Sequence, residues 1–124
     1  MSDAAALDPE EAFVASLSSC HMLWFLSIAA KASFVVNRYI DHAIGELGRN
    51  SEGKLVVTSV RLRPYVEWSE ANLPTQDRIN EMHQSAHGEC FIANSVKSDV
   101  RIEPVGCPND LFNEPTSRLV RRDN

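Results

Sequence analysis

The chain has 124 residues, enough for one hydrophobic core, so a second domain is not expected. Its net charge of -5, with lysines and arginines scattered along the sequence, argues against a nucleic-acid-binding surface. Three cysteines are too few for a secreted disulfide scaffold, so we predict a cytoplasmic protein.

A long helix is predicted at the start of the chain. Asp8 can accept hydrogen bonds from the first free amides, Pro9 suits the first helical position, and Glu11 stands three residues after Asp8. We expect this helix to run to about Phe34. Apolar residues cover most of its circumference, which predicts a helix buried on nearly all sides.

The same segment resembles a membrane span in length. Residues 12–30 contain no Asp, Glu, Lys or Arg, and a bilayer is crossed by a helix of about 20 residues. However, the polar run Ser18–His21 would be costly at the centre of a membrane. The residues before the helix are acidic, unlike the basic start of a signal peptide. We therefore predict no membrane segment.

A β-hairpin is predicted next. A strand near Arg38–Leu47 is followed by a Gly- and Asn-containing turn at Gly48–Gly53 and by a long strand, Leu55–Trp68, with alternating apolar residues. We expect the two strands to pair antiparallel.

The second half of the chain predicts a helix, a turn and a short strand. Pro74–Asp77 marks a helix start, and the apolar spacing continues to about Cys90. One further helical turn is expected within residues 91–96, and a strand within residues 100–105. Together these elements predict an α+β fold, with the central helix and the second helix packed against an antiparallel sheet.

The domain is expected to occupy residues 1–105. Residues 106–124 lack a hydrophobic period, which predicts an extended or mobile tail. Cys107 lies in this tail, where we interpret it as an incidental exposed thiol.

Cys20 and Cys90 are the candidates for chemistry. A thiolate can attack a peroxide oxygen, and a second thiol can then capture the resulting sulfenic acid. A disulfide between them requires their Cα atoms to lie within about 7 Å. In the alternative interpretation, both cysteines are small apolar residues of the core.

A metal site is a second alternative. His83, His87 and Cys90 stand at positions i, i+4 and i+7, so they share one helical face and could hold zinc or iron. The sequence contains no closely spaced pair of cysteines of the kind that zinc sites use. We therefore predict no metal and no other cofactor.

Three motifs carry a resemblance to a known family. They are the helix start Asp8–Glu11, the Ser-Cys-His run at Ser19–His21 and the block Glu89–Val96. From about Leu7 to Pro104 the chain resembles the OsmC/Ohr family of peroxide-reducing stress-response proteins. The resemblance implies an intertwined α+β homodimer with its sites at the subunit interface.

The resemblance also implies roles for individual residues. Cys20 would be the peroxidatic thiol, Cys90 the resolving thiol, and Glu10 the carboxylate that holds an activating arginine. The implied function is reduction of organic hydroperoxides, and of hydrogen peroxide, with an external dithiol as reductant. The alternative is a non-catalytic, truncated family member that acts as a dimerisation or small-ligand-binding module.

The chain departs from the family at its start. Family members carry strands before the Asp-Pro-Glu-Glu element, and the activating arginine lies there. A misassigned start, a truncation and a natural variant are all open explanations. If no other positive group replaces that cation, we expect Cys20 to titrate near or above an ordinary thiol, at about 8.5. Glu10 also lies ten residues before Cys20, about 15 Å along a continuous helix.

Overall fold

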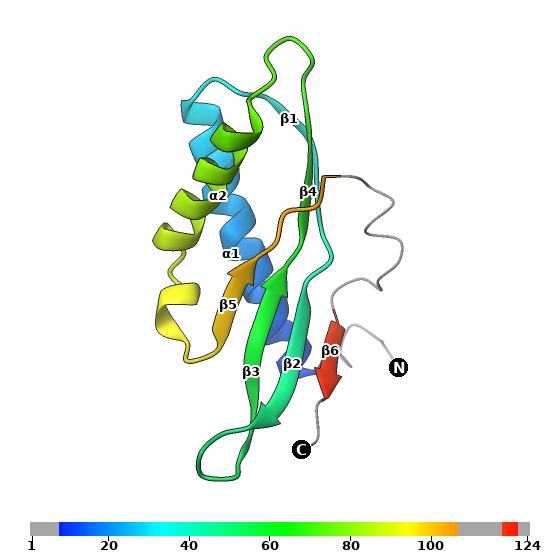
Figure 1. Ribbon diagram of the computed structural model, residues 1–124, viewed down its shortest axis with the longest axis vertical. Helices are drawn as coiled ribbons and strands as arrows, with labels where there is room; N and C mark the ends of the chain where they lie inside the picture. The colour runs from blue at the N-terminus through cyan, green and yellow to red at the C-terminus, as the bar shows by residue number, and fades with distance from the viewer. Residues whose placement is uncertain (1–7, 107–117, 122–124) are drawn as a thin grey trace.

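The computed structural model describes residues 8–106 and 118–121. Figure 1 shows two helices on one face of a long, bent hairpin. The elements are, in chain order, α1 (Pro9–Lys31), β1 (Val36–Asp41), β2 (Ile44–Arg49), β3 (Leu55–Leu62), β4 (Pro64–Trp68), α2 (Gln76–Glu89), the 3-10 turn η2 (Ala93–Ser95), β5 (Asp99–Ile102) and β6 (Arg118–Arg121).

The predicted hairpin is confirmed, but each of its two long strands is divided in two. β2 pairs antiparallel with β3 near the turn, and β1 pairs antiparallel with β4 beyond a bend at residues 42–43 and Arg63. The turn is closed by Asn50, whose side-chain oxygen accepts hydrogen bonds from the amides of Glu52 and Lys54, both at 2.9 Å. The bend separates two small sheets that face different parts of the helix pair.

The larger sheet is mixed, whereas the sequence predicted an antiparallel one. Its strand order is β5-β3-β2-β6, and β5 and β6 run parallel to their neighbours. The crossover through α2 returns the chain in the direction of β3, which explains the parallel pairing of β5. β6 falls within the segment that was predicted to be a tail, and four residues are too few to show a hydrophobic period.

α1 begins where the sequence predicted and ends earlier. The side chain of Asp8 accepts a 2.7 Å hydrogen bond from the Glu11 amide. The helix ends at Lys31 rather than Phe34, because Ser33 adopts a left-handed conformation with φ 67°. A left-handed residue stops a right-handed helix, and no sequence pattern at Ser33 signalled it.

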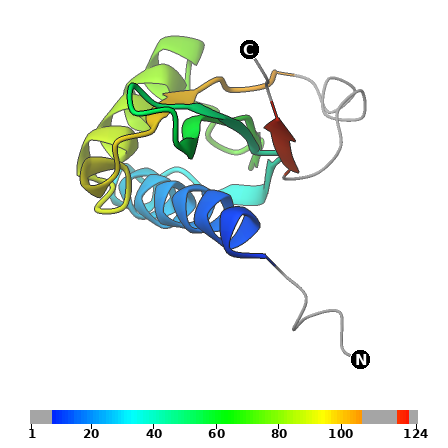
Figure 2. The same cartoon turned by 90° about the horizontal axis from the view of Figure 1, so that it is seen from below.

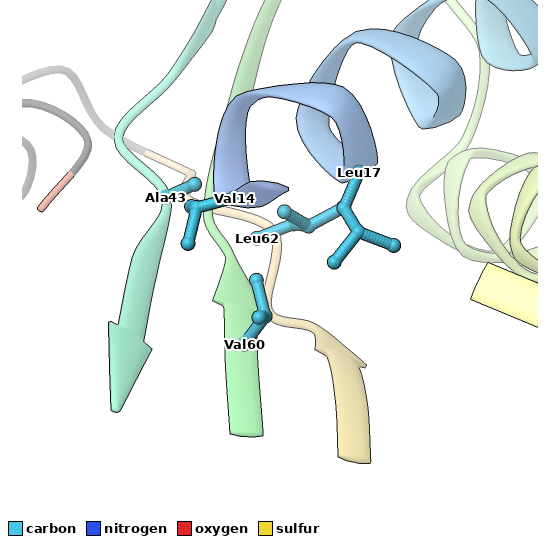
Figure 3. Packing of buried hydrophobic residues seen from close by; sticks show 5 residues of the cluster. All are labelled: Val14, Leu17, Ala43, Val60 and Leu62. Atoms are coloured by element: carbon cyan, nitrogen blue, oxygen red, sulfur yellow. The ribbon is translucent and has the colours of Figure 1, made fainter. Parts of the chain in front are cut away.

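One stripe of α1 forms the centre of the core. Its buried residues, spaced three or four apart, are Val14, Leu17, His21, Phe25 and Ala29. Figure 3 shows Val14 and Leu17 directed toward Ala43, Val60 and Leu62 of the hairpin. Nearer the C-terminus of α1, Phe25 and Ala29 pack against Met82 and Ala86 of α2. The same helix therefore contacts the larger sheet at one end, and α2 and the smaller sheet at the other.

The expectation that α1 is buried on nearly all sides is not met within one chain. Leu23, on the outer side, is 62% exposed, and Figure 2 shows α1 as an outer layer below the sheet. α1 is long and apolar enough to cross a membrane, a property that core helices of globular proteins share.

Candidate functional site

The fold brings Cys20 and Cys90 together. Cys20 lies in the middle of α1, and Cys90 is the residue that caps the C-terminus of α2. Their side chains are hydrogen-bonded to each other, and both are free thiols. Cys90 is 1% exposed, whereas Cys20 is half-buried and so remains reachable from solvent. Helices packed side by side thus place two thiols, seventy residues apart in sequence, in direct contact.

The chain that follows Cys90 wraps around the two sulfur atoms. The backbone amides of Phe91 and Ile92 donate hydrogen bonds to Cys20, and the amide of Ala93 donates to Sγ of Cys90 at 3.4 Å. Asn94 fixes the turn, because its side-chain amide donates to the carbonyls of Gly88 and Cys90, both at 3.0 Å. The Glu89–Val96 block of the sequence therefore supplies the backbone amides that donate hydrogen bonds to the sulfur of Cys20.

These donors change the acidity of Cys20. Burial alone would raise its pKa, but hydrogen bonds from the Cys90 thiol and from the amides of Ile92 and Phe91 outweigh burial and lower it. The pKa of Cys20 was expected near or above that of an ordinary thiol if nothing else stabilised the thiolate, and these hydrogen bonds supply a stabilisation that lowers it. Amide and thiol donors thus stabilise the Cys20 thiolate, a role that the family resemblance gives to an arginine.

Cys90 is shifted in the opposite direction. Burial raises its pKa, and its position as donor to the Cys20 sulfur, together with the negative charge there, raises it further. The pair thus consists of one thiol disposed to ionise and one disposed to keep its proton. This difference in acidity is what a reaction needs in which one thiolate attacks first and the second thiol reacts afterwards.

Glu10 does not join this site within one chain. It is exposed in the first turn of α1, and the helix continues without a break past Cys20, about 15 Å further along. Of the three predicted site residues, the structure therefore assembles Cys20 and Cys90 and leaves Glu10 apart.

Aromatic side chains border the thiols. Trp24, one turn after Cys20, meets Phe91 edge to face, with ring centroids 5.8 Å apart. Phe91 is 69% exposed although it follows the buried Cys90. An exposed phenyl ring beside two thiols gives the site an apolar rim.

The alternative zinc or iron site, with His83, His87 and Cys90 as ligands, is not assembled. Among the described residues there is no group of three or more His, Cys, Asp or Glu side chains that could hold a metal ion. Cys107 lies outside the described residues.

His83 instead meets His21, a contact that the sequence analysis did not foresee. Nε2 of His21 lies 3.0 Å from Nδ1 of His83, and both rings are buried. Burial lowers the pKa of His21 to about 4 and that of His83 to about 3. The sequence did carry a signal that His21 is buried. It lies four residues after Leu17 and four before Phe25, on the apolar stripe of the helix.

Comparison with known proteins agrees with the motifs. The model of the family described as OsmC-like protein matches residues 2–105. The chain is similar to the solved structure of an OsmC-like protein of unknown function from Vibrio cholerae, with 57% identity and a TM-score of 0.77. That alignment covers 79% of this chain and 64% of the Vibrio chain, so this chain spans less than two thirds of that relative.

More distant structures share the fold. The organic hydroperoxide resistance protein OhrB of Bacillus subtilis is 19% identical with a TM-score of 0.66, over 84% of this chain and 76% of OhrB. An organic hydroperoxide resistance protein OsmC from Legionella pneumophila is 16% identical with a TM-score of 0.62, over 78% and 66% of the two chains. No curated protein matches the chain significantly.

Proposed function

The chain belongs to the OsmC-like family, and from this premise we propose that it is a thiol-dependent reductase of organic hydroperoxides. The observation that carries the proposal is the contact between Cys20 and Cys90, with the pKa of Cys20 lowered and that of Cys90 raised. A peroxidatic thiol must ionise near neutral pH, and its partner must lie close enough to form a disulfide.

In the proposed reaction, the Cys20 thiolate attacks the distal oxygen of the hydroperoxide. A sulfur–oxygen bond forms, the O–O bond breaks, and the alkoxide leaves as an alcohol after taking a proton. Cys20 is then a sulfenic acid. The Cys90 sulfur attacks Cys20, water leaves with the hydroxyl oxygen, and a disulfide forms. An external dithiol restores both thiols by disulfide exchange and is itself oxidised.

The apolar rim supports an organic substrate. Trp24 and Phe91 offer aromatic surface beside Cys20, where an alkyl group can be buried while its peroxide reaches the sulfur. Hydrogen peroxide lacks such a group, so we expect it to be the poorer substrate.

We further propose that the protein acts as a homodimer in the cytoplasm. Leu23 and Phe91 are large, exposed apolar residues on α1 and beside the thiols, and a second copy is a natural cover for them. In this arrangement Glu10 would contribute to the site of the partner copy. Cellular thiols are kept reduced in the cytoplasm, as the external-dithiol step requires.

Consumption of cumene hydroperoxide with a small dithiol as reductant tests the proposal. The unmodified chain should turn over many times, and Cys20→Ser should have no activity. Cys90→Ser should undergo one oxidation and accumulate sulfenic acid, because only the resolving step is removed. Absence of turnover in the unmodified, folded chain would favour the non-catalytic module, and full turnover in Cys20→Ser would end the proposal.

A further inference from the structure

The buried histidine pair lies between the same two helices that carry the thiols. Nε2 of His21 and Nδ1 of His83 are 3.0 Å apart, and the ring planes are nearly parallel, at 6° with centroids 5.2 Å apart. His21 is 1% and His83 is 3% exposed. This is therefore a polar contact between two buried rings.

The pair is tied to the thiols by chain geometry. His21 follows Cys20 directly on α1, and His83 precedes Cys90 by seven residues, which is about two turns of α2. The two helices are thus joined by polar contacts at two places, one between histidines and one between thiols. Because each helix is a stiff rod, a shift at one contact is transmitted to the other.

Apolar contacts between α1 and α2 surround the pair, and His87, one turn after His83 on α2, is close enough to His21 to act on it electrostatically. Phe25 stacks on His83 with ring centroids 4.1 Å apart, and Phe25 and Ala29 pack against Met82 and Ala86. Apolar packing is non-directional and tolerates small sliding movements. A hydrogen bond in a low-dielectric interface is directional, and losing it leaves two buried nitrogens without a partner.

The pair has a single directional bond to lose. With both rings neutral, one nitrogen of the contact donates its proton and the other accepts it, so one hydrogen bond forms whichever tautomer is present. Among the described residues, the outer nitrogens of the pair, Nδ1 of His21 and Nε2 of His83, have no hydrogen-bond partner.

We propose that the hydrogen bond between His21 and His83 fixes the register of α1 against α2 and thereby holds the Cys20 and Cys90 thiols in contact. The two histidines are positioning residues, since they act through the helices and not on the substrate. The inference rests on the proposed function for its biological purpose, but the geometry of the dithiol can be measured without any peroxide.

The test is the equilibrium between the Cys20–Cys90 dithiol and its disulfide in buffers of reduced and oxidised glutathione. The Cys20 thiolate displaces one glutathione from the oxidised form, and Cys90 displaces the second, so two electrons pass to glutathione. The equilibrium constant reports how well the fold juxtaposes the thiols. Alkylation of free thiols followed by mass spectrometry gives the fraction oxidised.

Two substitutions of His83 distinguish the effect of its hydrogen bond from the effect of its size. Asn places an amide group near the position of Nδ1, so His83→Asn should retain the bond, and His83→Phe should remove it while preserving a ring. We expect His83→Phe to lower the equilibrium constant about tenfold, a shift of about 30 mV for this two-electron couple. His83→Asn should remain close to the unmodified protein.

Two further variants separate loss of the hydrogen bond from loss of folding. The double variant His21→Phe with His83→Phe leaves no unpaired nitrogen, so it should fold. Its dithiol–disulfide equilibrium constant should nevertheless fall about tenfold, as in His83→Phe. Ile44→Val on β2 serves as a control for general destabilisation and should leave the equilibrium unchanged, because Ile44 is a buried strand residue outside α1 and α2.

The inference is overturned if the folded double variant keeps the unmodified equilibrium constant, or if His83→Asn loses as much as His83→Phe. A protein that fails to consume hydroperoxide but shows the expected glutathione equilibria would refute the proposed function and leave the positioning role intact.

Discussion

The hydroxyl of Ser18 donates a 2.5 Å hydrogen bond to Oδ2 of Asp41, which ties α1 to the bend of the hairpin. The other carboxylate oxygen, Oδ1, accepts a 2.6 Å hydrogen bond from the amide of Arg63. The side chain of Asp41 therefore joins α1 to both strands at the bend. Its partner on α1, Ser18, lies two residues before Cys20 in sequence. Burial raises the pKa of Asp41, while the bonds from Ser18 and Arg63 oppose that rise.

Asp41→Ala should lower the free energy of unfolding by about 1–3 kcal/mol, because it leaves the Arg63 amide and the Ser18 hydroxyl without their acceptor. Asp41→Asn should cost less, since its carbonyl can still accept from Arg63. Urea unfolding at fixed protein concentration measures both. Glu81→Ala, which removes an exposed pair with Arg78, is the control and should cost under about 1 kcal/mol. Equal losses in Asp41→Ala and Glu81→Ala would contradict the role assigned to Asp41.

The second prediction concerns the ionisation of Cys20. Its alkylation rate should reach a plateau at a lower pH than that of an ordinary thiol, because hydrogen bonds stabilise the thiolate. Cys90→Ala removes one donor and should move the plateau to higher pH, whereas Cys90→Ser keeps a donor and should move it less. The readout is the rate of iodoacetamide reaction against pH, followed at Cys20 by mass spectrometry. A plateau unaffected by Cys90→Ala would show that Cys90 does not contribute.

The third prediction concerns acid stability. The pKa values of His21 and His83, about 4 and 3, lie below the ordinary 6.5, so between pH 6.5 and 4 the unfolded chain binds more protons than the folded one. The histidines therefore contribute stability that is complete above pH 6.5 and is lost as pH falls through their folded-state values. For His21 alone, the shift from 6.5 to about 4 corresponds to a loss of unfolding free energy on the order of 3 kcal/mol.

Urea unfolding from pH 7 to 4.5 checks this slope. Asp41 works in the opposite direction, since its raised pKa favours the folded state as pH falls toward 3.8. The double variant His21→Phe with His83→Phe retains Asp41 and should lose the histidine part of the slope. An unchanged slope in the double variant would mean that the two rings are not the groups responsible.

The fourth prediction concerns assembly. Light scattering at micromolar concentration should give twice the mass of one chain, because a second copy buries the apolar surface around Leu23 and Phe91. Leu23→Glu with Phe91→Glu should produce monomers. Leu73→Glu changes an equally exposed leucine in the loop before α2 and should leave the mass unchanged. A monomeric unmodified chain would contradict this surface as an interface.

Local sequence patterns predicted the helices, the hairpin and the cysteine pair. The cap at Asp8, the helix start near Pro74 and the alternation within Leu55–Leu62 depend on neighbouring residues, so they can be recognised without knowledge of the fold. The Glu89–Val96 motif predicted Cys90 as a candidate site residue, and the structure adds that the amides after it stabilise the sulfur of Cys20.

Tertiary structure decided everything that depends on residues distant in sequence. The parallel pairing of β5 and β6, the bend held by Asp41, the contact between His21 and His83 and the lowered pKa of Cys20 each arise from chain segments brought together by packing. A pKa depends on burial and on the hydrogen-bond donors within a few ångströms, and sequence order does not state which donors those are. The sequence alone thus determined which residues could react, and packing determined which thiol is disposed to ionise.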